Sequence, residues 1–250
     1  MNPLNLDQVR EYVNENIVDF HQRRIKSLEE LELRKLLTKN PYLFKAKNIA
    51  TAGELVSGLL DAFLSSSEEK LFGDFLEHLA VFIAGKTCDG HKSTAPGIDL
   101  EFFNKGVHYV VSVKSGTSWG NSSQQKKLEE DLRNAVVRVR QSKRGANIQP
   151  VLGICYGKTR TSYVRGYLKV VGQNFWCLIS DNQDLYTDII EPIGHRAKEH
   201  NEAFLFEKSR VTNRFTKLFI DGFCDDTGAI DWVKLVEFNS GNYDLDKFLS

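Results

Sequence analysis

Two apolar runs, residues 98–103 and 107–114, flank Lys105 and Gly106 and constrain the fold more than any other stretch. Both runs are rich in β-branched and aromatic residues, and a two-residue connection ending in glycine is typical of a β-hairpin. This turn pairs Asn104 with Val107 and therefore places Asp99 opposite Ser112. Side chains alternate between the two faces of a strand, so one face is predicted to be entirely apolar. The apolar face contains Ile98, Leu100, Phe102, Tyr109, Val111 and Val113.

The opposite face of the predicted hairpin is polar and charged. It contains Asp99, Glu101, Ser112 and Lys114. A shift of one residue would mix the two sets, so the pattern itself specifies the register. Burial of a carboxylate and an ammonium costs several kcal/mol unless they are paired or bind a metal. An edge hairpin with one solvated face explains the same alternation, and the hydrophobic pattern alone leaves both interpretations open.

A predicted helix precedes the hairpin, with Ser67 as its N-cap and acidic residues in its first turn. One stripe of this helix is apolar, and a second stripe surrounds one carboxylate with small residues. The second stripe contains Gly73, Glu77, Ala80 and Ala84. Small side chains let the helix approach a neighbouring backbone, with Glu77 projecting into the gap. An exposed glutamate on an ordinary amphipathic helix is the alternative.

Asp99, the run Ser112-Val113-Lys114 and the preceding helix with Gly73 and Glu77 together resemble the core of the PD-(D/E)xK nuclease superfamily. Three longer stretches resemble type II restriction endonucleases of that superfamily, and the likeness runs from about residue 71 to the C-terminal segment. These stretches are residues 113–128, 151–160 and 172–194. The resemblance implies an α/β (α+β) fold with a central mixed β-sheet flanked by helices. It also implies hydrolysis of phosphodiester bonds in double-stranded DNA.

The resemblance implies Mg²⁺ as the cofactor, with no further small-molecule cofactor, and a catalytic set of Asp99, Lys114, Glu77 and Ser112. Asp99 and the backbone carbonyl of Val113 are the expected metal ligands. Ser112 stands where the family usually has a second carboxylate, and a hydroxyl is a poor substitute for it. Glu77 is the first candidate for the missing ligand and Glu101 the second. Lys114 is expected to orient the attacking water or to steady the scissile phosphate.

Charge is distributed unevenly along the chain. Lysine and arginine total 33, as do aspartate and glutamate, yet residues 121–170 contain 11 basic and 3 acidic residues. A helix predicted over residues 122–144 turns most of its basic side chains outward, a pattern that suits DNA phosphates and also any solvated helix. The candidate DNA-binding residues are Asn121, Ser122, Gln124, Lys126, Lys158, Arg160 and Arg165.

The chain shows no linker rich in proline, glycine or serine. We expect a helical N-terminal extension over residues 1–64 and a nuclease core with a C-terminal DNA-recognition or structural segment over residues 65–250. The extension is either a dimerisation surface or a layer over the sheet. Expected helices are 6–20, 28–37 and 52–64; expected strands are 151–156, 167–171 and 175–178; a helical stretch from Leu185 and a mixed tail with Trp232 follow.

The start of the chain is polar, and no apolar run is long enough to span a membrane, so we expect a cytoplasmic protein without membrane contact. Its four cysteines are too widely spaced for a zinc site and are expected to be reduced.

Taken together, these patterns predict a Mg²⁺-dependent type II restriction enzyme that acts on DNA as a homodimer. Two alternatives are a structure-selective or repair nuclease of the same fold, and a DNA-binding module on a decayed nuclease fold, which the serine at position 112 motivates.

Overall fold

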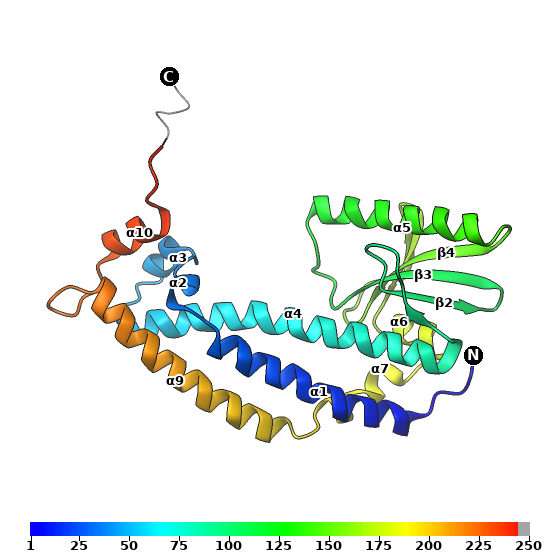
Figure 1. The fold of residues 1–250 in the computed structure, drawn as a ribbon, viewed down its shortest axis with the longest axis horizontal. Helices are drawn as coiled ribbons and strands as arrows, with labels where there is room; N and C mark the ends of the chain where they lie inside the picture. The colour runs from blue at the N-terminus through cyan, green and yellow to red at the C-terminus, as the bar shows by residue number, and fades with distance from the viewer. Residues whose placement is uncertain (245–250) are drawn as a thin grey trace. The chain divides into compact units, whose positions relative to one another are not determined.

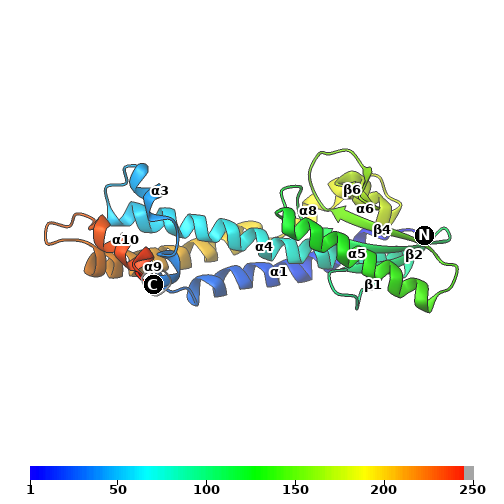
Figure 2. The same ribbon diagram turned by 90° about the horizontal axis from the view of Figure 1, so that it is seen from above.

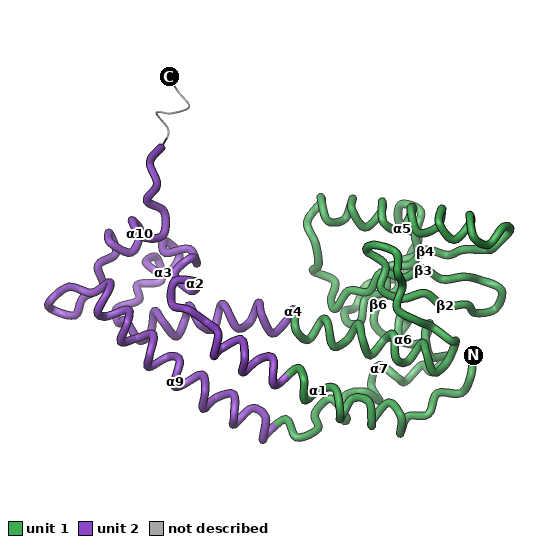
Figure 3. Tube along the Cα trace, in the orientation of Figure 1, with its two compact units in different colours: residues 1–20, 71–197 green, residues 21–70, 198–250 purple. Residues whose placement is uncertain are grey.

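A mixed six-stranded β-sheet organises the first of two structural units, which comprises residues 1–20 and 71–197 (Figure 3). The structure is a computed structural model that describes residues 1–244. The strand order is β1-β2-β3-β4-β6-β5; β3, β4 and β6 are parallel, and the β1–β2, β2–β3 and β5–β6 pairs are antiparallel. The strands are β1 (His91–Lys92), β2 (Leu100–Asn104), β3 (Val107–Lys114), β4 (Asn147–Ile154), β5 (Ser162–Val164) and β6 (Tyr167–Val171).

Helices cover both faces of this sheet, as Figures 1 and 2 show. On one face α5 buries Leu128 and Leu132 against Val110 and Leu152 of the strands. On the other face α1, α4 and α6 share a core with residues such as Val111 of β3. Because neither face of β3 is left to solvent, the half-solvated hairpin is excluded, and the predicted architecture of a mixed sheet flanked by helices is confirmed.

The helices begin and end as follows: α1 (Leu6–Glu29), α2 (Leu33–Leu36), α3 (Pro41–Ala46), α4 (Ala52–Cys88), α5 (Ser122–Ser142), α6 (Gln173–Ser180), α7 (Leu185–Asp188), α8 (Ile190–Ile193), α9 (Ala197–Phe223) and α10 (Trp232–Ser240). Both α1 and α4 run through a boundary between the two units. None of the helices in residues 1–244 is long and apolar enough to span a membrane.

The predicted N-cap at Ser67 is wrong, because Ser67 lies inside the continuous helix α4. No glycine or proline interrupts residues 59–72. The serines there are accommodated within the helix: the Ser66 hydroxyl donates to the carbonyl of Ala62, one turn earlier, and the Ser67 Oγ lies 3.4 Å from the Ser27 Oγ.

The strand predicted over residues 175–178 is also wrong, since these residues belong to α6. Gly172, with a φ of 57°, turns the chain out of β6, and its carbonyl accepts from the amides of Phe175 and Trp176. Phe175, Trp176 and Ile179 are buried on one side of the helix, which is helical spacing rather than the alternation of a strand.

The second unit comprises residues 21–70 and 198–250 and, over the part that is described, is built from helices. Residues from α9 and α10, including Phe215 and Leu235, share its core with residues of the N-terminal half of the chain. The imidazoles of His21 and His200 stack with centroids 4.4 Å apart. Burial, together with the nearby His200 and Arg24, lowers the pKa of His21 to about 4. The separation into an extension and a nuclease core stays a prediction.

Candidate active site

The β2–β3 hairpin sets the geometry of the site, and its register is the one that the sequence predicts. Asn104 pairs with Val107 across a turn in which Lys105 and Gly106 have φ values of 48° and 79°. Left-handed φ at both central residues is the hallmark of the type I′ turn, and glycine accommodates it without strain. The pairing ends with Leu100 and Val111. Asp99 lies just before β2, and its amide also donates to the Val111 carbonyl at 2.9 Å, so the backbone pairing does not continue to the predicted partner Ser112.

Ile98 departs from the predicted face. It belongs to the core beneath α5, together with Val110, instead of the core beneath α4. Ile98 lies before the first paired residue of β2, and its amide donates to the carbonyl of Ala95 in a turn, so strand alternation does not govern its direction.

The Asp99 carboxylate lies beside the end of β3 and close to Lys114. Its Oδ2 accepts from the Val113 amide at 2.7 Å and from the Ser112 hydroxyl at 3.3 Å, and it lies 3.8 Å from the Lys114 Nζ. Lys114 also donates to the Val113 carbonyl at 2.9 Å. The Asp99 side chain is 15% exposed and that of Lys114 is 33% exposed. The acid and the amine therefore converge on the same side of the sheet and remain open to solvent.

Glu77 reaches this cluster through a third residue, Lys92 of β1. The Lys92 ammonium bonds the Glu77 Oε1 and lies 3.6 Å from the Asp99 Oδ1. Burial opposes the charged amine, but the hydrogen bond and charge of Glu77, together with Asp99, outweigh it and raise the pKa of Lys92. The carboxylates of α4 and of the segment before β2 thus share one protein cation. Sequence reasoning missed Lys92, because a strand of two residues has no recognisable pattern.

Glu101 points its carboxylate oxygens to other partners. One oxygen accepts from the Ser93 hydroxyl at 2.5 Å and the other lies 3.0 Å from the His108 Nε2. Burial alone would raise the pKa of Glu101, but the hydrogen bonds from Ser93 and His108 lower it. Both oxygens are therefore engaged outside the Asp99 cluster, and the structure brings Glu77 to Asp99 instead.

Ser112 supports the acid that it faces. Its side chain is buried, at 1% exposure, and its hydroxyl donates to Asp99. Cys155, at the end of the adjacent strand β4, is also buried. Burial and the charge of Glu77 raise the pKa of the Cys155 thiol, which disfavours the thiolate form.

The oxygen atoms of this cluster suit a hydrated divalent cation. Residues 1–244 contain no group of three or more histidine, cysteine, aspartate or glutamate side chains arranged to hold a metal. The available donors are two carboxylates, Asp99 and Glu77, and the carbonyl of Val113, which already accepts from an ammonium. Mg²⁺ takes oxygen ligands and usually keeps several waters, so a small hard donor set is sufficient.

Two of the predicted DNA-binding residues form the N-terminal cap of α5. The Asn121 side chain accepts from the amides of Ser123 and Gln124, while the Gln124 side chain accepts from the Asn121 amide at 2.9 Å. This reciprocal arrangement is a capping box, and it engages the side-chain oxygen of each residue, which is one of the two groups that bidentate recognition of adenine would use. Ser122 and Lys126, in the first turns of α5, are exposed. Their contact with DNA stays a prediction.

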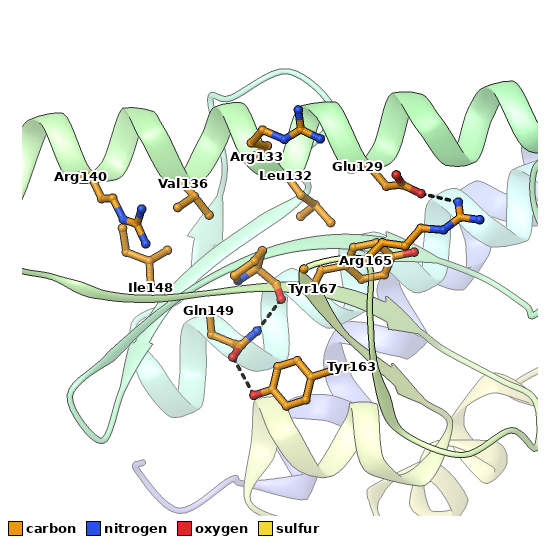
Figure 4. A pocket seen from close by; sticks show the side chains of 12 residues that line it. Glu129, Leu132, Arg133, Val136, Arg140, Ile148, Gln149, Tyr163, Arg165 and Tyr167 are labelled. Carbon is orange, nitrogen blue, oxygen red and sulfur yellow. Dashed lines mark hydrogen bonds and ion pairs between the residues drawn. The ribbon is translucent and has the colours of Figure 1, made fainter.

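The predicted basic loop residues separate into two places. Lys158 and Arg160 are exposed between β4 and β5, whereas Arg165 forms an ion pair of 2.6 Å with Glu129 of α5. Figure 4 shows that pair at one end of a pocket of about 330 Å³ beside α5. Two arginines of α5 also line the pocket. They are Arg133 and Arg140.

A mixed sheet covered by helices, with an acid just before β2, a lysine at the end of β3 and a carboxylate from the preceding helix, is the arrangement expected of a restriction-endonuclease-like fold. Residues 7–201 match the family model of the type II restriction endonuclease EcoO109I, and the chain belongs to this family. The match extends further toward the N-terminus than the resemblance from about residue 71 and covers α1 from residue 7, and it ends at residue 201, before the C-terminal segment. No curated protein matches the chain. Family membership makes the protein a site-specific deoxyribonuclease, a DNA-binding hydrolase of a kind that is typically metal-dependent.

Proposed function

We propose that the protein cleaves double-stranded DNA with Mg²⁺ held by Asp99, Glu77 and the Val113 carbonyl. The observation that carries this proposal is the single ammonium shared by the two carboxylates, beside which Lys114 lies 3.8 Å from Asp99. Two acids gathered around one positive charge offer oxygen ligands that a divalent cation can also use. When bound, Mg²⁺ activates water and neutralises charge on the phosphoryl group and on the departing oxygen.

The residues of the chain have distinct tasks in this proposal. Asp99 is oriented by the Val113 amide and the Ser112 hydroxyl, so one oxygen is fixed while the other faces Glu77 through Lys92. Lys114 presents a flexible ammonium next to Asp99 and orients the attacking water or steadies the scissile phosphate. Ser112 acts by positioning Asp99, which accounts for a hydroxyl where the family usually has a second acid.

The test combines metal binding with plasmid cleavage. Ca²⁺ takes the same oxygen ligands. Titration with Ca²⁺ is expected to show that the affinity of Glu77→Gln is lower than that of the wild type by about tenfold or more. Glu101→Gln is the matched control, because the Glu101 oxygens bond Ser93 and His108. The Ca²⁺ affinity of this variant is expected to stay within about twofold of the wild type.

Cleavage of plasmid DNA into discrete fragments should require Mg²⁺ and stop with a chelator. The reverse order of the two variants would reassign the ligand to Glu101, and DNA binding without cleavage by the wild type would support the decayed module.

We further propose that two copies act on one duplex. A symmetric recognition sequence offers two equivalent half-sites and two strands, which a homodimer matches by its own symmetry. Light scattering of the complex with a short symmetric duplex should give twice the chain mass of 28.5 kDa plus the DNA. One chain per duplex at saturating protein would contradict this proposal.

A further inference from the structure

Lys92 is held beside the two carboxylates by the backbone of β1. It pairs with Leu100, and the amide of the following residue, Ser93, donates to the Asp99 carbonyl at 3.3 Å. The position of the main chain therefore does not depend on the ion pair. From this fixed point the Lys92 side chain extends to Glu77 of α4 and to the Asp99 Oδ1.

The ammonium and a divalent cation would use the same oxygens. Glu77 and Asp99 repel one another unless a positive charge lies between them, and Lys92 supplies that charge. The Lys92 side chain is 52% exposed, so it has an open path into solvent when another cation takes its place. Lys114 differs in this respect, since it bonds the Val113 carbonyl and contacts Asp99 through the other oxygen.

We propose that Lys92 is a placeholder cation that keeps Glu77 and Asp99 together before metal binds and is displaced by the divalent ion. This inference rests on the proposed function, because it assumes that these two carboxylates hold the metal. Lys92 is a positioning residue here, since it acts on the metal ligands. Its presence weakens metal binding by competition and stabilises the metal-free site.

The placeholder role predicts opposite effects on metal binding and on metal-free stability. Lys92→Gln and Lys92→Met are expected to bind Ca²⁺ about tenfold more tightly than the wild type, which corresponds to about 1.4 kcal/mol. The same variants should unfold at a lower temperature in chelator, because the two acids lose their shared partner. Lys92→Arg keeps the charge and is expected to restore both properties. A purely structural lysine would lower stability without tightening metal binding.

The decisive measurement is calorimetric titration of Ca²⁺ into the full-length protein without DNA, together with thermal unfolding in chelator. Lys127→Gln is the matched control, since Lys127 pairs with Asp131 on α5 at 2.8 Å and its loss changes net charge equally. Unchanged or weaker Ca²⁺ binding by both Lys92 variants overturns the placeholder role, as does equal tightening in Lys127→Gln. The wild-type site is tested separately with Asp99→Asn and Glu77→Gln. If neither weakens Ca²⁺ binding, the proposed metal site fails; if both do while Lys92 variants stay unchanged, only the placeholder role fails.

Discussion

Asp99→Asn is expected to lower the rate of DNA cleavage by about 1000-fold or more, equivalent to about 4 kcal/mol of lost transition-state stabilisation. The amide has the size of the carboxylate, and its oxygen still accepts from the Val113 amide, so the local fold is retained. What disappears is the negative charge next to Lys114 and Lys92. Single-turnover cleavage of a plasmid at saturating enzyme measures the chemical step, and filter binding in Ca²⁺ measures DNA affinity.

Lys114→Met is expected to give a loss of similar size, because the variant keeps the aliphatic stem and removes the ammonium. Lys105→Asn provides the control: Lys105 is an exposed lysine at the tip of the same hairpin, and asparagine tolerates its left-handed φ of 48°. This control should cleave at the wild-type rate. Wild-type cleavage by either Asp99→Asn or Lys114→Met would place the chemistry elsewhere in the molecule.

The hairpin could be predicted because its determinants are local. The turn at Lys105 and Gly106 and the alternation on both strands each select the same register, and the structure has that register. The convergence of Asp99 and Lys114 needs more than this register, because Asp99 lies before the first paired residue. Its carboxylate reaches the end of β3 by accepting from the Ser112 hydroxyl and the Val113 amide. Ile98 was misplaced where the strand pattern ends and a turn begins.

Other parts depend on contacts that no local pattern records. The strand expected over residues 175–178 became helix α6, because four apolar residues in a row carry no clear period and the turn at Gly172 decides their direction. The second unit joins residues 21–70 to residues 198–250, which lie far apart in the sequence. Lys92 lies beside the two carboxylates because it belongs to β1, an edge strand of only two residues that the sequence pattern does not reveal. The sequence likewise could not decide whether Glu77 or Glu101 accompanies Asp99. That decision depends on Ser93 and His108, which bond the carboxylate oxygens of Glu101.

The close packing of α6 on the sheet leads to a second large expected effect. Gly153 lies in β4, paired with Val113 on one side and Val170 on the other, at the centre of the sheet. A Cβ added at Gly153 would overlap the ring of Phe175, which is fully buried. Gly153→Ala is therefore expected to destabilise the protein by about 1–3 kcal/mol through overpacking, although alanine is otherwise the better strand residue. Phe175→Ala is expected to cost about 3–5 kcal/mol through the cavity it leaves.

Because one ring causes both effects, the two substitutions should be strongly non-additive. In the Phe175→Ala background the ring that a Cβ at position 153 would overlap is absent, and this Cβ fills part of the cavity. The destabilisation caused by Gly153→Ala should therefore fall to about zero or change sign. Urea unfolding of all four proteins, followed by the fluorescence of nearby Trp176, measures this coupling. Gly73→Ala is the control. Gly73 lies in α4 of the same unit, and a Cβ there meets only Ser115, at an ordinary distance of 3.6 Å. This substitution should leave the stability unchanged or raise it. Additive costs for Gly153 and Phe175 would show that the ring yields without strain and that α6 is not held this closely against β4.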